Sequence, residues 1–180
     1  MSIKFVFNKE IIDKCLDELA KELLKLRCKH KIEIILVGGS SILLNYHFRA
    51  NSYDIDAYYK SDILKQAISN VTDLLDLQVG WINDDFVKTT SYTPKIIEFS
   101  EFYKEFRNIL DVRTVSKEYL IAMKLKSFRK YKNDIQDIIG ILDEDKTITL
   151  QRIKNAVIDL YGSFEYIDIE ARNFIEVLLH

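Results

Sequence analysis

Gly38-Gly39-Ser40 is the first of two short segments whose residue types could carry chemistry, and it directly follows the apolar run 33–37. Two glycines at the end of a buried strand allow a tight turn and let the backbone approach a ligand closely. A helix beginning at Ser40 directs its unpaired amides and the positive end of its dipole at the same point. The segment therefore predicts a phosphate site, to which the Ser40 hydroxyl adds a donor.

The second segment is Asp54-Ile-Asp56, in a stretch that alternates and is rich in strand formers. Its two carboxylates are two residues apart, so both project from the same face of a strand. Adjacent carboxylates repel each other unless a cation lies between them, and Mg²⁺ is the natural choice. Phosphoryl transfer needs such ions to neutralise the triphosphate. We expect Asp54 and Asp56 to be catalytic metal ligands, with Gly38, Gly39 and Ser40 binding the nucleotide.

Each segment also has a purely structural interpretation when it is taken alone. Gly-Gly-Ser occurs in ordinary strand-to-helix turns, and Asp-x-Asp at a strand start is often a solvated edge or a cap. Their succession in the order strand, Gly-Gly-Ser, short helix and Asp-Ile-Asp strand is much less common. The succession favours the functional interpretation.

This succession resembles the signature of the DNA polymerase beta-like nucleotidyltransferase superfamily, in which an apolar residue, Gly, and Gly or Ser precede Asp-apolar-Asp-apolar. More narrowly, it is similar to small bacterial families related to the AbiEii toxins. In those families a Ser or Thr precedes the acidic pair by two positions, where this chain has Ser52. They often carry an arginine four positions before the first Asp, where this chain has Ala50, with Arg49 beside it.

A second block, residues 118–138, looks like the helical Leu-x-Ala-x-Lys-Leu…Asp-x-x-Asp segment of the same relatives. This resemblance implies that Lys124 contacts the nucleotide phosphates and that Asp134 lies near the catalytic centre. The residues themselves leave alternatives open. Lys124 lies in a mostly apolar helix, where its amine either reaches solvent or meets an anion. Asp134 is near a helix start and either stabilises the helix dipole or takes part in catalysis.

The superfamily site usually includes a third carboxylate from a later strand. Asp111 and Glu98 are the candidates in this sequence. We prefer Asp111, because its strand alternates Asp111 and Arg113 on one face with apolar residues on the other. The resemblance covers roughly residues 33 to 145 and includes the segment Trp81-Ile-Asn-Asp-Asp.

Hydrophobic periodicity and capping residues indicate the elements that position these residues. We predict helices over residues 8–29, 41–46, 61–75, 117–130, 133–142, 150–161 and 164–179, and strands over 33–37, 54–59, 95–99 and 109–115. These elements predict the α/β (α+β) class, and the resemblance implies a nucleotidyltransferase fold with a mixed sheet flanked by helices. Residues 1–115 would form this core, and residues 116–180 a helical C-terminal part packed on it.

The composition bounds the function classes. With 180 residues and a formal net charge of −2, the chain is long enough for a core but lacks the overall basic excess of most nucleic-acid-binding domains. Cys15 and Cys28 are expected on the first helix as small buried hydrophobes, because no histidine stands at zinc-ligand spacing. No apolar run is long enough to span a membrane. We expect a cytoplasmic protein without a membrane partner.

Residues and resemblance together predict a nucleotidyltransferase that uses a nucleoside triphosphate such as ATP and Mg²⁺. It would transfer the nucleoside monophosphate to a hydroxyl of an RNA such as tRNA, a protein or a small molecule. The AbiEii resemblance adds a toxin–antitoxin or phage-defence setting, with a cognate antitoxin as partner. The alternative is a catalytically inactive nucleotide-binding or protein-interaction module with the same fold, which Ala50 and the unassigned third acid favour.

Overall fold

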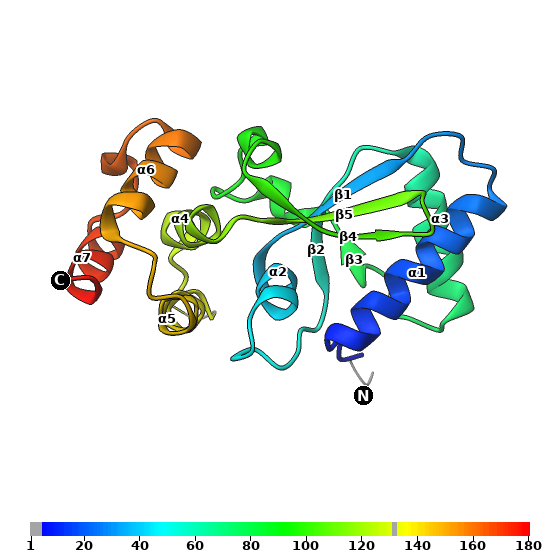
Figure 1. Ribbon diagram of the computed structural model, residues 1–180, viewed down its shortest axis with the longest axis horizontal. Helices are drawn as coiled ribbons and strands as arrows, with labels where there is room; N and C mark the ends of the chain where they lie inside the picture. Colours follow the sequence, from blue (N-terminus) through cyan, green and yellow to red (C-terminus); the bar gives the residue numbers. More distant parts are fainter. Residues whose placement is uncertain (1–4, 131–132) are drawn as a thin grey trace. The chain divides into compact units, whose positions relative to one another are not determined.

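The computed structural model describes residues 5–130 and 133–180, which divide into two compact units (Figure 1). The first unit comprises the described residues of Met1–Asp84 together with Glu101–Thr114. The second unit comprises Asp85–Ser100 and Val115–His180.

The first unit is built on a mixed sheet whose strands lie in the order β3-β2-β1-β5-β4. Strand β1 pairs with β2 antiparallel and with β5 parallel, and β3 pairs with β2 parallel. Arg107 and Asn108, both with positive φ, form the turn between β4 and β5, as is usual for tight hairpins. The strand bounds are β1 Ile32–Leu36, β2 Ile55–Tyr58, β3 Ile82–Asn83, β4 Ser100–Phe106 and β5 Leu110–Val115.

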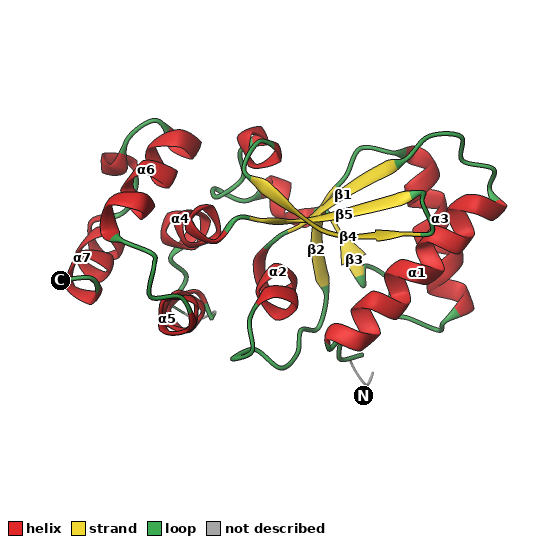
Figure 2. Cartoon of the chain, viewed as in Figure 1, coloured by secondary structure: helices red, strands yellow, loops and turns green. Residues whose placement is uncertain are grey.

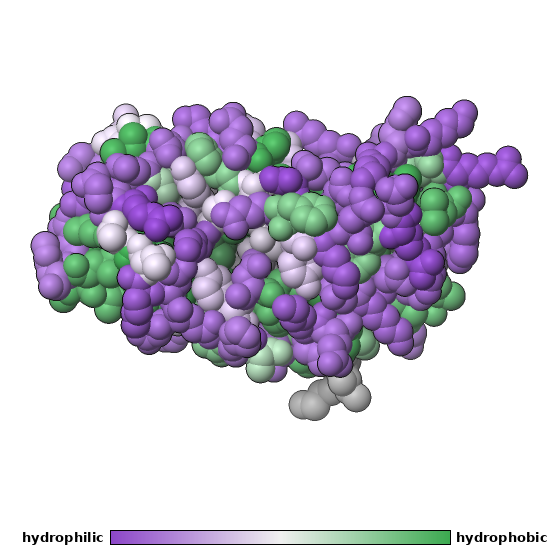
Figure 3. Space-filling model, viewed as in Figure 1, coloured by the Kyte–Doolittle hydropathy of each residue, from purple (hydrophilic) through white to green (hydrophobic). Residues whose placement is uncertain are grey.

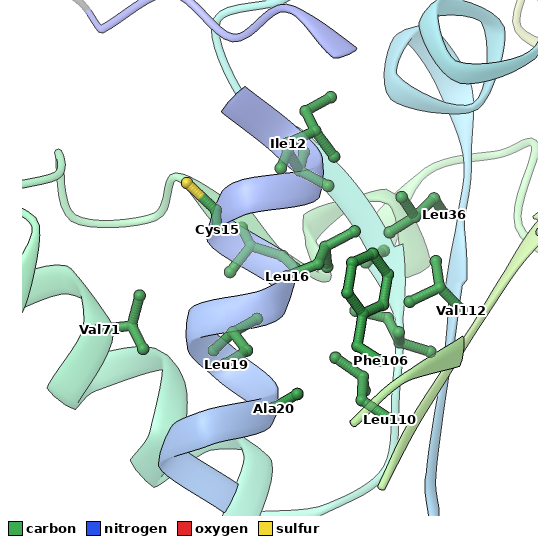
Figure 4. Packing of buried hydrophobic residues seen from close by; sticks show 14 of the residues in the cluster. Ile12, Cys15, Leu16, Leu19, Ala20, Leu36, Val71, Phe106, Leu110 and Val112 are labelled. Atoms are coloured by element: carbon green, nitrogen blue, oxygen red, sulfur yellow. The ribbon is translucent and has the colours of Figure 1, made fainter. Parts of the chain in front are cut away.

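Three helices accompany this sheet: α1 Lys9–Lys25, α2 Gly38–Asn45 and α3 Asp62–Leu74. Capping side chains begin two of them, since Asn8 accepts a hydrogen bond from the Ile11 amide and Ser61 from the Leu64 amide. Helices α1 and α3 lie side by side along the sheet (Figure 1). Their apolar stripes pack on the strands, as the close-up around Leu16 and Val112 shows (Figure 4). Burial of apolar side chains between these helices and the sheet stabilises the strands that carry the candidate site.

The second unit consists mainly of helices (Figure 2). Its helices are α4 Lys117–Ser127, α5 Asp134–Glu144, α6 Leu150–Tyr161 and α7 Ile169–Leu178. Helix α6 ends at Gly162, whose φ of 90° is the left-handed conformation that glycine adopts easily. In the described part of the chain, no helix is both long and apolar enough to cross a membrane. Hydrophilic residues dominate the face shown in Figure 3.

The structure confirms the α/β class with a mixed sheet. The predicted strand 95–99 is wrong, because Pro94–Ile97 forms a 3₁₀ helix with Pro94 in its first turn and Thr93 as its cap. The strand lies at Ser100–Phe106 instead, at the edge of the sheet, where most of its side chains are exposed and the apolar alternation is lost.

Two helix boundaries also differ from the prediction. Helix α1 ends at Lys25 because Arg27 adopts the left-handed conformation, so the half-buried Cys28 lies beyond the helix while Cys15 is buried within it. The expected helix 164–179 is divided: Phe164–Tyr166 is a 3₁₀ turn, and Asp168 caps the separate helix α7.

Candidate nucleotide site

The Gly38-Gly39-Ser40 segment forms the start of α2, as predicted. Val37 is extended at the N-cap position and its amide donates to the Asp56 carbonyl at 2.9 Å. Gly38 then turns the chain with a φ of +58°, a conformation that costs a residue with a Cβ atom about 1 kcal/mol or more. Among the described side chains none caps α2, so its first-turn amides are directed at whatever occupies the space before the helix.

Asp56 lies directly against this turn. A Cβ atom built on Gly38 would be 3.2 Å from the Asp56 Oδ2 atom, closer than ordinary van der Waals contact. Glycine is therefore required both by the backbone conformation and by the carboxylate beside it. Asp56 is half-buried, whereas Asp54, just before β2, is exposed. The two predicted motifs therefore meet at Asp56, which lies beside the start of α2.

Arg49 contributes a positive charge at the same place. A Cβ atom built on Gly39 would lie 2.6 Å from the Arg49 Nη2 atom and 2.7 Å from Cζ, so the guanidinium rests directly on the Gly39 backbone. The Nε atom of Arg49 donates to the Asn51 carbonyl at 3.3 Å, which helps to orient the side chain. A guanidinium beside a helix N-terminus favours an anionic ligand, because both carry positive charge.

The two serines of the motifs have structural bonds. Ser40 is buried, and its hydroxyl donates to the Val37 carbonyl at 2.9 Å and lies 3.4 Å from the Asp56 carbonyl. The hydroxyl thus ties the first turn of α2 to the two strands. Ser52 donates to the Asp54 carbonyl at 2.9 Å and pairs through its backbone with Phe7, which positions the first aspartate.

A family model described as "Nucleotidyltransferase of unknown function (DUF6036)" matches residues 14–168. The chain belongs to this nucleotidyltransferase family. The matched range includes both motifs of the site and extends through α4 and α5. Among curated proteins, none matches the chain.

Asp111 is not brought to the acidic pair of this nucleotidyltransferase. Asp56 lies beside Val37, whereas Asp111 is in register with Glu33 on the far side of β1. Four residues along the strand and two strand spacings across the sheet separate the two positions by about 16 Å. Asp111 instead lies 3.5 Å from the amine of Lys31. Glu98, the other candidate, follows the 3₁₀ helix Pro94–Ile97 in the second unit.

Lys124 and Asp134 come together in the second unit of the nucleotidyltransferase. The buried amine of Lys124 lies 3.2 Å from Asp134 Oδ1 and 2.7 Å from Asp137 Oδ2. Arg129 donates to Asp134 through its side-chain Nε and its backbone amide, both at 3.0 Å, and the Ser127 hydroxyl adds another bond at 3.0 Å. These contacts join the end of α4 to the start of α5.

The charges in this cluster compensate one another. Burial by itself would raise the pKa of Asp134, but the hydrogen bonds from Arg129 and the charge of Lys124 outweigh it and lower the pKa to about 2. Asp134 is therefore a carboxylate near neutral pH. In this arrangement Lys124 and Asp134 hold two helices together through a buried ion-pair network.

The sequence alone gave no role at the site to two residues that the structure places there or beside it, Arg49 and Asn83. Arg49 stands one position away from the arginine of the AbiEii-related pattern, but its guanidinium reaches Gly39. Asn83 lies on β3, a strand too short to be recognised by its alternation. The signals for this segment were the apolar pair Trp81-Ile82 before Asn83 and its place in the resemblance.

Proposed function

We propose that this protein transfers a nucleoside monophosphate from a nucleoside triphosphate, bound with Mg²⁺, to a hydroxyl group, releasing pyrophosphate. The observation that carries the proposal is the arrangement at the start of α2. There the Asp56 carboxylate and the Arg49 guanidinium lie against the consecutive residues Gly38 and Gly39. Opposite charges beside unpaired helix amides suit a phosphate chain with its metal ion.

The donor atoms fit a hard cation. Asp56 offers carboxylate oxygens from β2, Asp54 lies one residue before that strand, and Mg²⁺ prefers such ligands. Asp54 and Asp56 would hold the ion, which neutralises the triphosphate when it is bound. The α2 amides and Arg49 would bind the phosphate oxygens and keep the pyrophosphate in line with the attacking oxygen.

The reaction would be an in-line displacement at the α-phosphorus. The acceptor oxygen forms a bond to this phosphorus, the bond to the bridging oxygen breaks, and pyrophosphate leaves with the electron pair. The proton of the acceptor hydroxyl is released to solvent.

No group of three or more histidine, cysteine or acidic side chains that could hold a metal occurs within residues 5–130 and 133–180.

The acceptor and the biological setting rest on resemblance alone. We propose an RNA such as tRNA, a protein or a small molecule as acceptor, and a toxin–antitoxin or phage-defence setting with a cognate antitoxin, in the cytoplasm.

The second candidate function is a nucleotide-binding module without catalysis. The distance of Asp111 from Asp56 favours this candidate, because the preferred third carboxylate does not lie beside the acidic pair.

The double variant Asp54→Asn with Asp56→Asn tests the metal site. Removing two repelling charges should leave the melting temperature in EDTA unchanged or higher. Stabilisation by Mg²⁺ with nucleoside triphosphate should disappear, as should transfer of label from each α-³²P-labelled triphosphate to bulk tRNA or total protein. The matched control is Asp62→Asn with Asp73→Asn, which removes the same charge from α3.

Two results would contradict this assignment or part of it. A double variant that melts markedly lower in EDTA, yet responds to Mg²⁺ and nucleotide as the wild type does, would show that the aspartates are structural. Wild-type protein that is stabilised by Mg²⁺ and nucleotide but labels no acceptor would support the binding module instead of the enzyme.

A further inference from the structure

Strand β3 places Asn83 beside Asp56. In the parallel pairing of β2 with β3, Ile55 is in register with Ile82 and Asp56 with Asn83. Residues in register on neighbouring strands project from the same face of a sheet, about 4.8 Å apart. Asn83 is therefore the neighbour of Asp56 on the side of β2 away from β1.

The burial pattern identifies the face that these two residues share. Ile55 and Ile82 both belong to the buried core. Because side chains alternate along a strand, Asp56 and Asn83 project from the opposite face, and both are half-buried there. Asp54 lies in the bend directly before β2, two residues from Asp56.

The segment that carries Asn83 is firmly anchored. Trp81 is completely buried, stacks on Phe7 with ring centroids 6.0 Å apart, and donates from Nε1 to the Thr72 hydroxyl at 2.9 Å. Its carbonyl accepts from the Ile55 amide at 2.8 Å, which pins the register of β3 on β2. The position of Asn83 relative to Asp56 is thus set by a buried tryptophan two residues away.

A hydrogen bond also orients the side-chain amide. The Nδ2 atom of Asn83 donates to the Gly80 carbonyl at 3.1 Å. The nitrogen and oxygen of an amide point in different directions from their shared carbon, so the oxygen is not directed at the Gly80 carbonyl. An amide oxygen is a ligand of the type that Mg²⁺ and Mn²⁺ accept.

We propose that Asn83 supplies a third oxygen ligand to the metal ion held by Asp54 and Asp56. The inference rests on the proposed function of the same site. The third ligand then comes from β3 and not from β5, where Asp111 lies, and it is a neutral amide instead of a carboxylate. Mg²⁺–oxygen distances near 2.1 Å are compatible with side chains from adjacent strands sharing one ion.

Calorimetric titration with Mn²⁺ alone, without nucleotide, tests the assignment. Asn83→Ala should weaken Mn²⁺ binding about tenfold, the size of effect seen when a group that supports a metal site is removed. Asn83→Asp should bind Mn²⁺ at least as tightly as the wild type, because it keeps an oxygen and adds a negative charge. Both variants lose the hydrogen bond to Gly80, so the loss of that bond does not account for a difference in Mn²⁺ affinity between them.

Asp84→Ala is the matched control. Asp84 directly follows Asn83 and projects away from Asp56, so this substitution should leave Mn²⁺ affinity unchanged. Melting in EDTA checks that each variant is folded. If Asn83→Ala binds Mn²⁺ like the wild type while Asp56→Asn does not bind, the role of Asn83 is refuted and the two-aspartate site stands. If Mn²⁺ binding is insensitive to Asp54 and Asp56 as well, the proposed function fails with it.

Discussion

Gly38 and Gly39 are adjacent, yet replacing each by alanine should have opposite effects on the free energy of unfolding. Gly39 has an ordinary helical conformation, so Gly39→Ala introduces no backbone strain. The exchange should leave the free energy of unfolding unchanged or raise it by up to about 1 kcal/mol, since alanine is the better helix former. Nucleotide binding should nevertheless weaken, because the new methyl group occupies the place of the Arg49 guanidinium.

The distances give the size of this displacement. The added carbon would lie 2.6 Å from Nη2 and 2.7 Å from Cζ of Arg49, whereas ordinary contact begins near 3.4 Å. The guanidinium must therefore move by roughly 1 Å, and its flexible side chain allows this at small cost. Loss of one charge-assisted phosphate contact corresponds to about 1.5–3 kcal/mol, or about ten- to hundredfold in affinity.

Gly38→Ala is the contrasting variant. Its φ of +58° predicts a loss of stability of about 1 kcal/mol or more, and its Cβ would press on Asp56 Oδ2 at 3.2 Å. The assays are urea unfolding in EDTA for stability and calorimetry with Mg²⁺ and each triphosphate for binding. A Gly39→Ala protein that is fully stable and binds nucleotide with wild-type affinity would refute the assignment of Arg49 and of this turn to the phosphates.

Two further predictions concern the buried cluster of the second unit. Lys124→Met should lower the free energy of unfolding by about 3 kcal/mol, because it leaves Asp137 and Asp134 without their buried amine. Urea unfolding measures this loss, and the control Lys126→Met on the same helix should have a much smaller effect. The lowered pKa of Asp134, about 2 against 3.8, implies about 2 kcal/mol of stability that is present above pH 4 and is lost as the pH falls toward 2. The stability gap between wild type and Asp134→Asn should therefore narrow between pH 5 and pH 2.5, and a gap that is constant with pH would contradict the pairing.

Local patterns in the sequence were sufficient where the physics is local. The apolar run 33–37, followed by two glycines, predicted a buried strand, a turn and a short helix, and the structure has all three. The Asn8 and Ser61 caps located the starts of α1 and α3, because a cap satisfies amides of its own helix. Local pattern misled at Lys95–Phe99, where a proline-led 3₁₀ turn replaces the strand.

What the sequence by itself determined was the pairing of a glycine turn with two aspartates, and hence the class of chemistry. Which residues surround that pair was decided by the tertiary structure. Strand order and register put Asn83 beside Asp56 and Asp111 about 16 Å away, and the course of the chain after α2 brought Arg49 over Gly39. Hydrogen bonds between strands far apart in the sequence leave no periodic signal in either strand, so these neighbours follow only from the folded sheet.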